Sequence, residues 1–215
     1  MSDKSNKYGY VGVDIPEQSF GANKGVFNPA EINELVADNK WSSFGQLELI
    51  ETQTISGTPS TLSFDSIQES TYNVHFMTIS EYQPQTDNRH LALRFKTGGV
   101  TDSGFNYQYA MQRNTAATSS ELKSGNDSKI WLAYNSSNIS NETTNGYIYI
   151  YNAGDSSKYT FITTQFMMID KDTNHSTNFQ SAVYDIANVV NGIEFSTSGD
   201  PLEYGTLSLY GIRYS

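Results

Sequence analysis

The sequence contains no cysteine, so disulfide bonds, thiol nucleophiles and thiolate metal ligands are excluded. Its three histidines, His75, His90 and His175, form none of the spacings typical of a zinc or iron site. His75 lies in an apolar stretch and is expected to be a hydrogen-bonded sheet residue. No nucleophile elbow or Walker loop is present either. We therefore predict no catalytic residue, no cofactor and no metal, and a protein that is not an enzyme.

Two weaker chemical interpretations stay open. Asp170, Asp172 and Asn174 match the first three ligand positions of a calcium loop, but His175 and Ser181 replace the glycine and glutamate of an EF-hand. An EF-hand is rejected, whereas a looser calcium site is not. Acidic residues are also numerous enough for two of them to meet across a sheet as a glycosidase pair.

Positive charge is scarce. The chain has 13 Lys and Arg against 23 Asp and Glu, a formal net charge of −10, and no basic cluster. Binding to nucleic acid or to an anionic membrane is disfavoured, because both require a basic face. The first residues lack the apolar region of a secretory signal, and no stretch has the length of a membrane span. These absences predict a soluble protein that is not exported by the usual signal.

Proline is rare as well, with 5 residues, and charged residues make up 17 % of the chain, against about a quarter in average proteins. The 15 tyrosines and many Ser, Thr and Asn residues favour twisted sheets over helices. Turn-rich segments separate the expected strands, and a polar loop is expected between residues 113 and 129. The expected strands are 46–54, 61–67, 71–82, 89–97, 105–113, 129–134, 146–151, 159–169, 181–186, 192–198 and a final strand from 205. This spacing predicts an all-β fold, a jelly-roll-like antiparallel β-sandwich over residues 46–215.

Residues 1–45 are predicted to form an N-terminal arm and one short helix. The helix is expected within FNPAEINELVADNKW, where Asn28 is a good N-cap and Pro29 suits the first helical position. Ile32, Leu35 and Val36 form a single apolar stripe, which indicates a helix on a surface.

Two strands carry informative patterns. In GYIYIY, Tyr147, Tyr149 and Tyr151 share one face while the isoleucines share the other, which is expected to face the core. The tyrosines then either pack across strands on an ordinary outer face or contact a partner or ligand. In the final GTLSLYGIRYS, the apolar rhythm changes phase at Gly211, which predicts a bulge there, in a strand paired inside a sheet.

Three stretches together carry a resemblance to a known family. The stretch GVFNPAEINELVADNKW resembles the opening of virion structural proteins of tailed phages that infect marine bacteria, especially cyanophages. The ending, with its Ile-Glu-Phe strand, Gly-Asp-x-Leu turn and SLYGIR, is similar to the close of tail and fibre modules in such phages, and TLSFDSIQESTYNVHFMTISEY resembles their early strand pair.

The resemblance implies a non-enzymatic tail, fibre or capsid-surface protein that is assembled in the host cytoplasm and located in the virion. It implies attachment to other virion proteins through the N-terminal segment, with contacts from Phe27, Ile32, Leu35, Val36 and Trp41. Phage assemblies are symmetric, so a homo-oligomer is expected, with a trimer as the first candidate. The alternative is a lectin-like module that binds a host surface glycan through Trp131, Tyr147, Tyr149 and Tyr151. A polysaccharide depolymerase is the third hypothesis.

Overall fold

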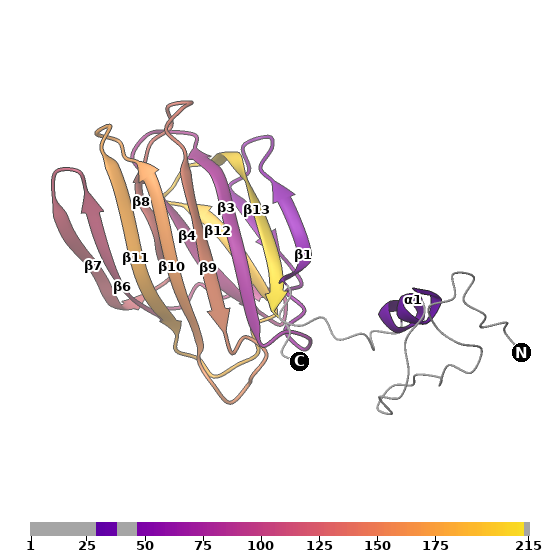
Figure 1. Ribbon diagram of the computed structural model, residues 1–215. Coiled ribbons are helices and arrows are strands. Elements are labelled where there is room, and N and C mark those ends of the chain that lie inside the picture. The colour runs from indigo at the N-terminus through magenta and orange to yellow at the C-terminus, as the bar shows by residue number, and fades with distance from the viewer. Residues whose placement is uncertain (1–28, 38–46, 213–215) are drawn as a thin grey trace, which may run out of the picture. The chain divides into compact units, whose positions relative to one another are not determined.

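The structure, a computed structural model, describes residues 29–37 and 47–212 (Figure 1). The chain divides after Phe44 into an N-terminal unit and a β-domain. The β-domain consists of two antiparallel sheets that pack face to face. The prediction of an all-β antiparallel sandwich is confirmed.

The larger sheet has eight strands in the order β1-β13-β3-β9-β10-β11-β6-β7. Their bounds are β1 Leu47–Thr54, β13 Leu202–Ile212, β3 Val74–Pro84, β9 Thr144–Tyr151, β10 Thr160–Ile169, β11 His175–Tyr184, β6 Tyr107–Thr115 and β7 Ser119–Asp127. Strand β13 lies between β1 and β3, so this C-terminal strand is paired on both sides, as expected.

The smaller sheet has five strands, and β4 is the strand with most partners. Its strands are β2 Thr61–Phe64, β12 Gly192–Thr197, β4 Arg89–Thr97, β5 Val100–Thr101 and β8 Ile130–Ser136. They run in the order β2-β12-β4-β5, and β8 also pairs with β4.

Two segments differ from the sequence prediction. The expected polar loop after residue 113 contains strand β7, which pairs with β6 at the edge of the larger sheet. This strand has one partly buried apolar residue, Leu122, so it lacks the alternation that reveals a strand. Strand β11 begins at His175 and not at residue 181, as was predicted. The prediction missed the first half of this strand because the inward residues there, Ser176 and Asn178, are polar yet fully buried.

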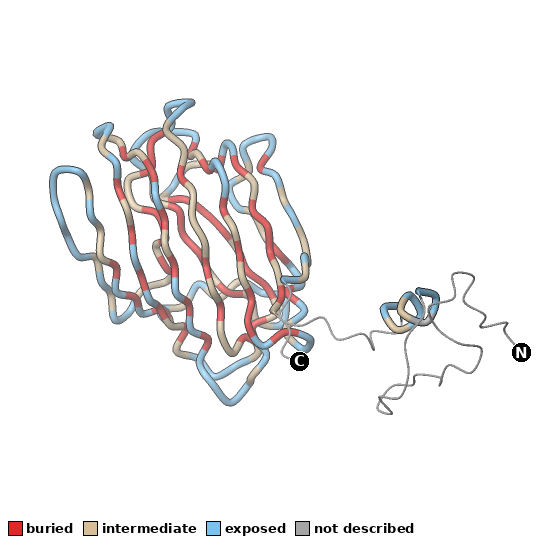
Figure 2. Tube along the Cα trace, in the orientation of Figure 1, coloured by how far each residue is buried: buried red, intermediate tan, exposed pale blue. Residues whose placement is uncertain are grey.

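The core lies between the two sheets, where buried and exposed residues alternate along most strands (Figure 2). Ile148 and Ile150 are fully buried, as their alternation with tyrosine predicts. From the smaller sheet, the rings of Phe64 and Phe195 meet edge to face at 6.3 Å. His75 is also fully buried, and its Nε2 hydrogen-bonds the carbonyl oxygen of Ile67 at 2.8 Å, which confirms it as a sheet residue of the core.

The predicted bulge at Gly211 is wrong. The pairing of β13 with β3 is regular from Thr206 to Ile212, and Gly211 continues the inward face of Leu207 and Leu209. A Cβ at Gly211 would lie 2.2 Å from the ring of Tyr72, so this glycine leaves room for a buried aromatic ring. The register shifts occur instead in β1, between Leu49 and Glu51, and near the start of β13.

The N-terminal unit contains helix α1, Pro29–Ala37, which lies within the predicted window. Ile32 and Leu35 are partly exposed, and Val36 is 55 % exposed. The predicted arm over residues 1–27, the N-cap Asn28, and the attachment residues Phe27 and Trp41 lie outside the described residues. Over residues 29–37 and 47–212, no helix is long and apolar enough to cross a membrane.

Candidate binding surface on the larger sheet

The outer faces of the two sheets differ in charge. On the smaller sheet, Arg94 and Glu194 are cross-strand neighbours 4.0 Å apart, and Lys96 pairs with Asp65 at 2.5 Å. These charges satisfy one another at the surface. This face therefore resembles an ordinary solvated surface.

On the outer face of the larger sheet, a central region that crosses seven strands, from β1 to β6, carries no charge. Its outward residues form rows of cross-strand neighbours, which the strand register defines. The first row is Leu47, Ile212, Val74, Tyr151, Phe161, Val183 and Gln108. The middle row is Leu49, Tyr210, Phe76, Tyr149, Thr163, Ser181 and Ala110. The third row is Thr52, Ser208, Thr78, Tyr147, Gln165, Phe179 and Gln112. In a chain with a net charge of −10, three rows without a single charge mark this face as different from the rest.

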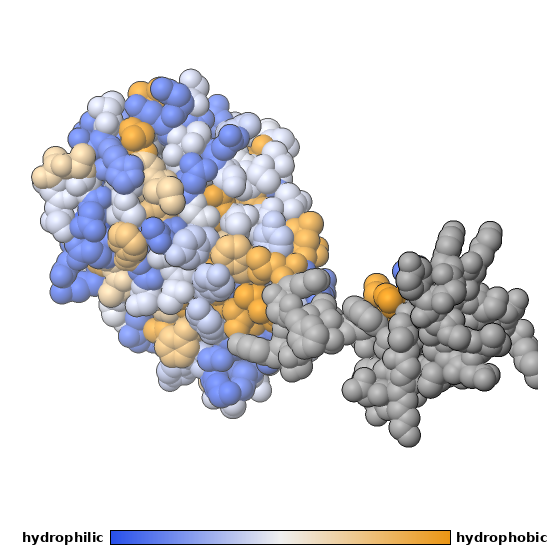
Figure 3. Space-filling view, viewed as in Figure 1, coloured by the Kyte–Doolittle hydropathy of each residue, from blue (hydrophilic) through white to orange (hydrophobic). Residues whose placement is uncertain are grey.

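One half of this face is apolar and aromatic. We call it the apolar patch, and it consists of Leu47, Leu49, Val74, Phe76, Tyr149, Tyr151, Tyr210 and Ile212. Phe76 is at its centre, with its ring centroid 4.8 Å from that of Tyr149 and 6.1 Å from that of Tyr210. Leu47 and Leu49 are 50 % and 59 % exposed. Figure 3 shows apolar side chains gathered over the ends of these strands.

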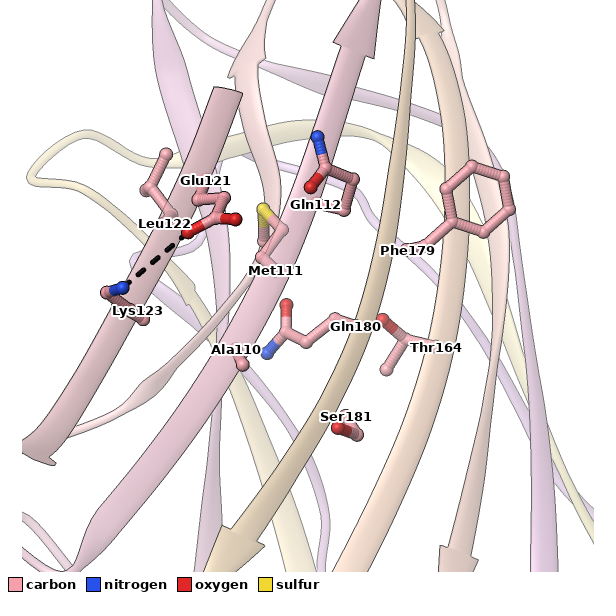
Figure 4. A pocket seen from close by; sticks show the side chains of 10 residues that line it. All are labelled: Ala110, Met111, Gln112, Glu121, Leu122, Lys123, Thr164, Phe179, Gln180 and Ser181. Atoms are coloured by element: carbon pink, nitrogen blue, oxygen red, sulfur yellow. Dashed lines mark ion pairs between the residues drawn. The ribbon is translucent and has the colours of Figure 1, made fainter. Parts of the chain in front are cut away.

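The other half of the face is hollowed. Two adjoining depressions, of about 510 Å³ and 470 Å³, share Ala110 and Ser181 in their lining. The small residues Ala110, Ser181 and Thr163 of the middle row lie between the larger side chains of the first and third rows. We call this feature the transverse groove, and Figure 4 shows residues of the part nearest to β7.

The structure brings the three predicted tyrosines together on this face. Tyr147, Tyr149 and Tyr151 follow one another along β9, with ring centroids 5.9 Å and 6.3 Å apart. Sequence reasoning missed Phe76 and Tyr210, which complete the cluster. Alternation could place each of them on a face of its own strand, but only the strand order makes them neighbours.

Trp131 does not belong to this surface. It lies on β8 in the smaller sheet, partly buried and packed against the core. The Nζ of Lys129 lies 4.8 Å from the centroid of its ring, and His90 meets the ring edge to face at 5.5 Å. His90 in turn stacks on Tyr134 at 3.7 Å and accepts a hydrogen bond from the backbone N–H of Asn135. Burial lowers the pKa of His90 to about 4, so this ring is neutral at pH 7 and serves packing.

In the candidate calcium loop, the first carboxylate, that of Asp170, accepts hydrogen bonds from other groups of the protein. Asp170 is 1 % exposed, and its Oδ2 accepts a hydrogen bond from Arg113 Nη2 at 2.6 Å. Its Oδ1 accepts the backbone N–H groups of Asp172 and Asn174 at 3.0 and 3.1 Å. These donors occupy the oxygens that a calcium ion would need, and the carboxylate thereby holds the turn between β10 and β11. In the part of the chain that the structure describes, no group of three or more His, Asp or Glu side chains could hold a metal ion.

Comparison with known proteins adds no relative, since no protein-family model matches the chain and no curated protein matches its sequence. The surface that the structure offers for a binding role is the uncharged region of the larger sheet.

Proposed function

We propose that this protein is a non-enzymatic structural component of a phage virion, in the tail, the fibre or the capsid surface. Subunit interfaces hold it there, and the apolar patch forms the contact between copies of the chain. The three sequence stretches described above support the virion role. The observation that carries the interface is a partly exposed aromatic patch, flanked by the exposed Leu47 and Leu49, in an uncharged region of this face.

Electrostatics favours this face for self-association. Two copies that each carry a net charge of −10 repel one another over most of their surfaces. The uncharged face is where they can approach without placing like charges opposite each other. The patch also has the anatomy of an interface, an apolar centre with a polar rim. The rim includes paired hydroxyl groups, such as Thr52 with Ser208 at 2.9 Å and Thr54 with Thr206 at 3.3 Å.

Sedimentation velocity of the purified protein tests the interface. The double variant Leu47→Glu/Leu49→Glu places charge on two exposed residues of an edge strand, where folding tolerates it. We expect an oligomer for the natural protein and at least tenfold weaker association for this variant. The matched control is Val100→Glu/Phe105→Glu, whose side chains are 70 % and 67 % exposed outside the patch. A monomeric natural protein, or equal effects of the two variants, would contradict the interface.

Quantitative peptide mass spectrometry of gradient-purified virions tests the virion role separately. Copies in the hundreds per particle would indicate a capsid-surface protein, and about a dozen or fewer would indicate a tail or fibre. Absence from the particle would refute the virion role.

A further inference from the structure

We infer that the transverse groove is a binding site for an uncharged polysaccharide chain. This inference goes beyond the proposed function, because it assigns a ligand to the half of the face that the apolar patch leaves open. The groove adjoins Tyr149, one of the glycan-contact residues expected from the sequence, but not Trp131, which lies on the other sheet.

The shape of the groove follows from the register. Its floor, Thr163, Ser181 and Ala110, crosses β10, β11 and β6, a distance of roughly 10 Å. The first and third rows stand four residues apart along each strand, or roughly 13 Å. One end is closed by Tyr149, whereas the other leads to edge strand β7. The groove is therefore shallow, about as wide as it is long, and open at one end, so a chain of linked rings can lie on the floor and continue past β7.

The walls combine aromatic rings with amide side chains. Phe161 and Phe179 stand on opposite walls and are 47 % and 44 % exposed. Exposed rings of this kind give a sugar an apolar surface on which to stack, and amides and hydroxyls pair with its hydroxyl groups. Ser181 and Thr163 provide such hydroxyls on the floor.

Three glutamine side chains of the walls are already held in place. Gln108 donates to Asp185 Oδ2 at 2.8 Å, Gln112 donates to Ser119 Oγ at 2.7 Å, and Gln165 accepts from the Tyr147 hydroxyl at 2.9 Å. These hydrogen bonds restrict the rotamers of the three amides before a ligand binds. Preorganised walls of this kind reduce the entropic cost of binding.

Charge decides among ligand classes. The floor and wall residues on β10, β11 and β6 carry no charge, whereas Lys123 and Glu121 line the groove where it reaches β7 and pair with each other at 3.5 Å. A nucleic acid or an acidic polysaccharide would meet a single cation in this lining, Lys123, which is already paired with Glu121, and would be repelled by the net charge of −10. A neutral, hydroxyl-rich chain needs no cations and is not repelled by the net charge.

Affinity electrophoresis tests the inference, since an acidic protein migrates readily in a native gel. The gels contain dextran, laminarin or galactomannan as neutral probes, or alginate as an acidic probe. We expect retardation of the natural protein by at least one neutral polysaccharide and none by alginate. Retardation in no neutral gel, or by alginate alone, would overturn the inference.

Two variants and a control locate the site. Ser181→Tyr fills the floor at an exposed strand position and should weaken retardation at least tenfold, and Phe179→Ala should weaken it by removing a wall. Thr177→Tyr adds the same ring on the same strand outside the groove and should bind like the natural protein. Undiminished binding by Ser181→Tyr would also overturn the inference.

The groove and the subunit interface can be tested independently. Leu47→Glu/Leu49→Glu should still be retarded by the polysaccharide, and Ser181→Tyr should keep the natural oligomeric state.

Discussion

Replacement of Gly211 by alanine tests the packing at the end of β13. The added Cβ would lie 2.2–2.4 Å from three ring carbons of Tyr72. Tyr72 is 5 % exposed and its hydroxyl donates to Glu48 Oε2 at 2.7 Å, so the ring cannot move aside without losing that bond. The backbone at Gly211 has a negative φ, which alanine adopts without strain. Any cost is therefore steric and not conformational.

The expected magnitude is the balance of two effects. Overpacking of a well-packed core costs about 1–3 kcal/mol. Loss of glycine flexibility in the unfolded chain returns about 0.4–1 kcal/mol. Mid-range values of the two effects give a fall of about 1.3 kcal/mol in the free energy of unfolding, and at most about 2.6 kcal/mol, and the mid-range fall lowers Tm by about 3–5 °C for a domain of this size.

Urea denaturation and calorimetry measure the effect, and a double-mutant cycle assigns it. Tyr72→Leu removes the ring, so Gly211→Ala should cost at least about 1 kcal/mol less in that background. Gly125→Ala is the control for added side-chain bulk in a strand, since Gly125 lies exposed on edge strand β7 with no atom within 4 Å of an added Cβ. It should be neutral or slightly stabilising. A Gly211→Ala protein as stable as the Gly125→Ala protein would refute the packing argument.

Two further predictions concern buried polar groups. Arg113→Met leaves the carboxylate of Asp170 buried without its cation and should cost about 3–5 kcal/mol, whereas Arg113→Met/Asp170→Asn should recover part of that loss. Equal stability of the single and double variants in urea would contradict this pairing. For His90, the folded-state pKa of about 4 lies below the unfolded value near 6.5, so the unfolded state binds the proton first and stability falls as the pH decreases from 6.5 to 4. The full shift corresponds to about 3 kcal/mol, and we expect about half of it because the ring is partly exposed. The His90→Phe variant should lose less stability than the natural protein between pH 7 and pH 4.5, and parallel pH curves would show that His90 does not contribute.

Alternation along single strands determined much of this molecule. The rhythm of GYIYIY was sufficient to bury Ile148 and Ile150, because successive side chains of a strand point to opposite faces. The same reasoning failed where the pattern was weak or ambiguous. Strand β7 has too few apolar residues to alternate, and the apparent change of phase at Gly211 came from counting Tyr210 and Ile212 as core residues when they face outward.

The candidate sites could be predicted only in part. The tyrosines of β9 are visible in the sequence, and so is the scarcity of positive charge. The apolar patch, however, combines residues from 47 to 212, and the transverse groove combines β6, β10 and β11, which are not all neighbours along the chain.

The sequence by itself therefore determined the class of fold, the lack of charge on particular strand faces, and the residues that could stack or hydrogen-bond. Tertiary structure alone decided which of those strands lie side by side and in what register. Side-chain periodicity is a local property of the backbone, whereas strand order depends on how distant segments bury their apolar faces together. A surface made from rows of cross-strand neighbours exists only after that second step.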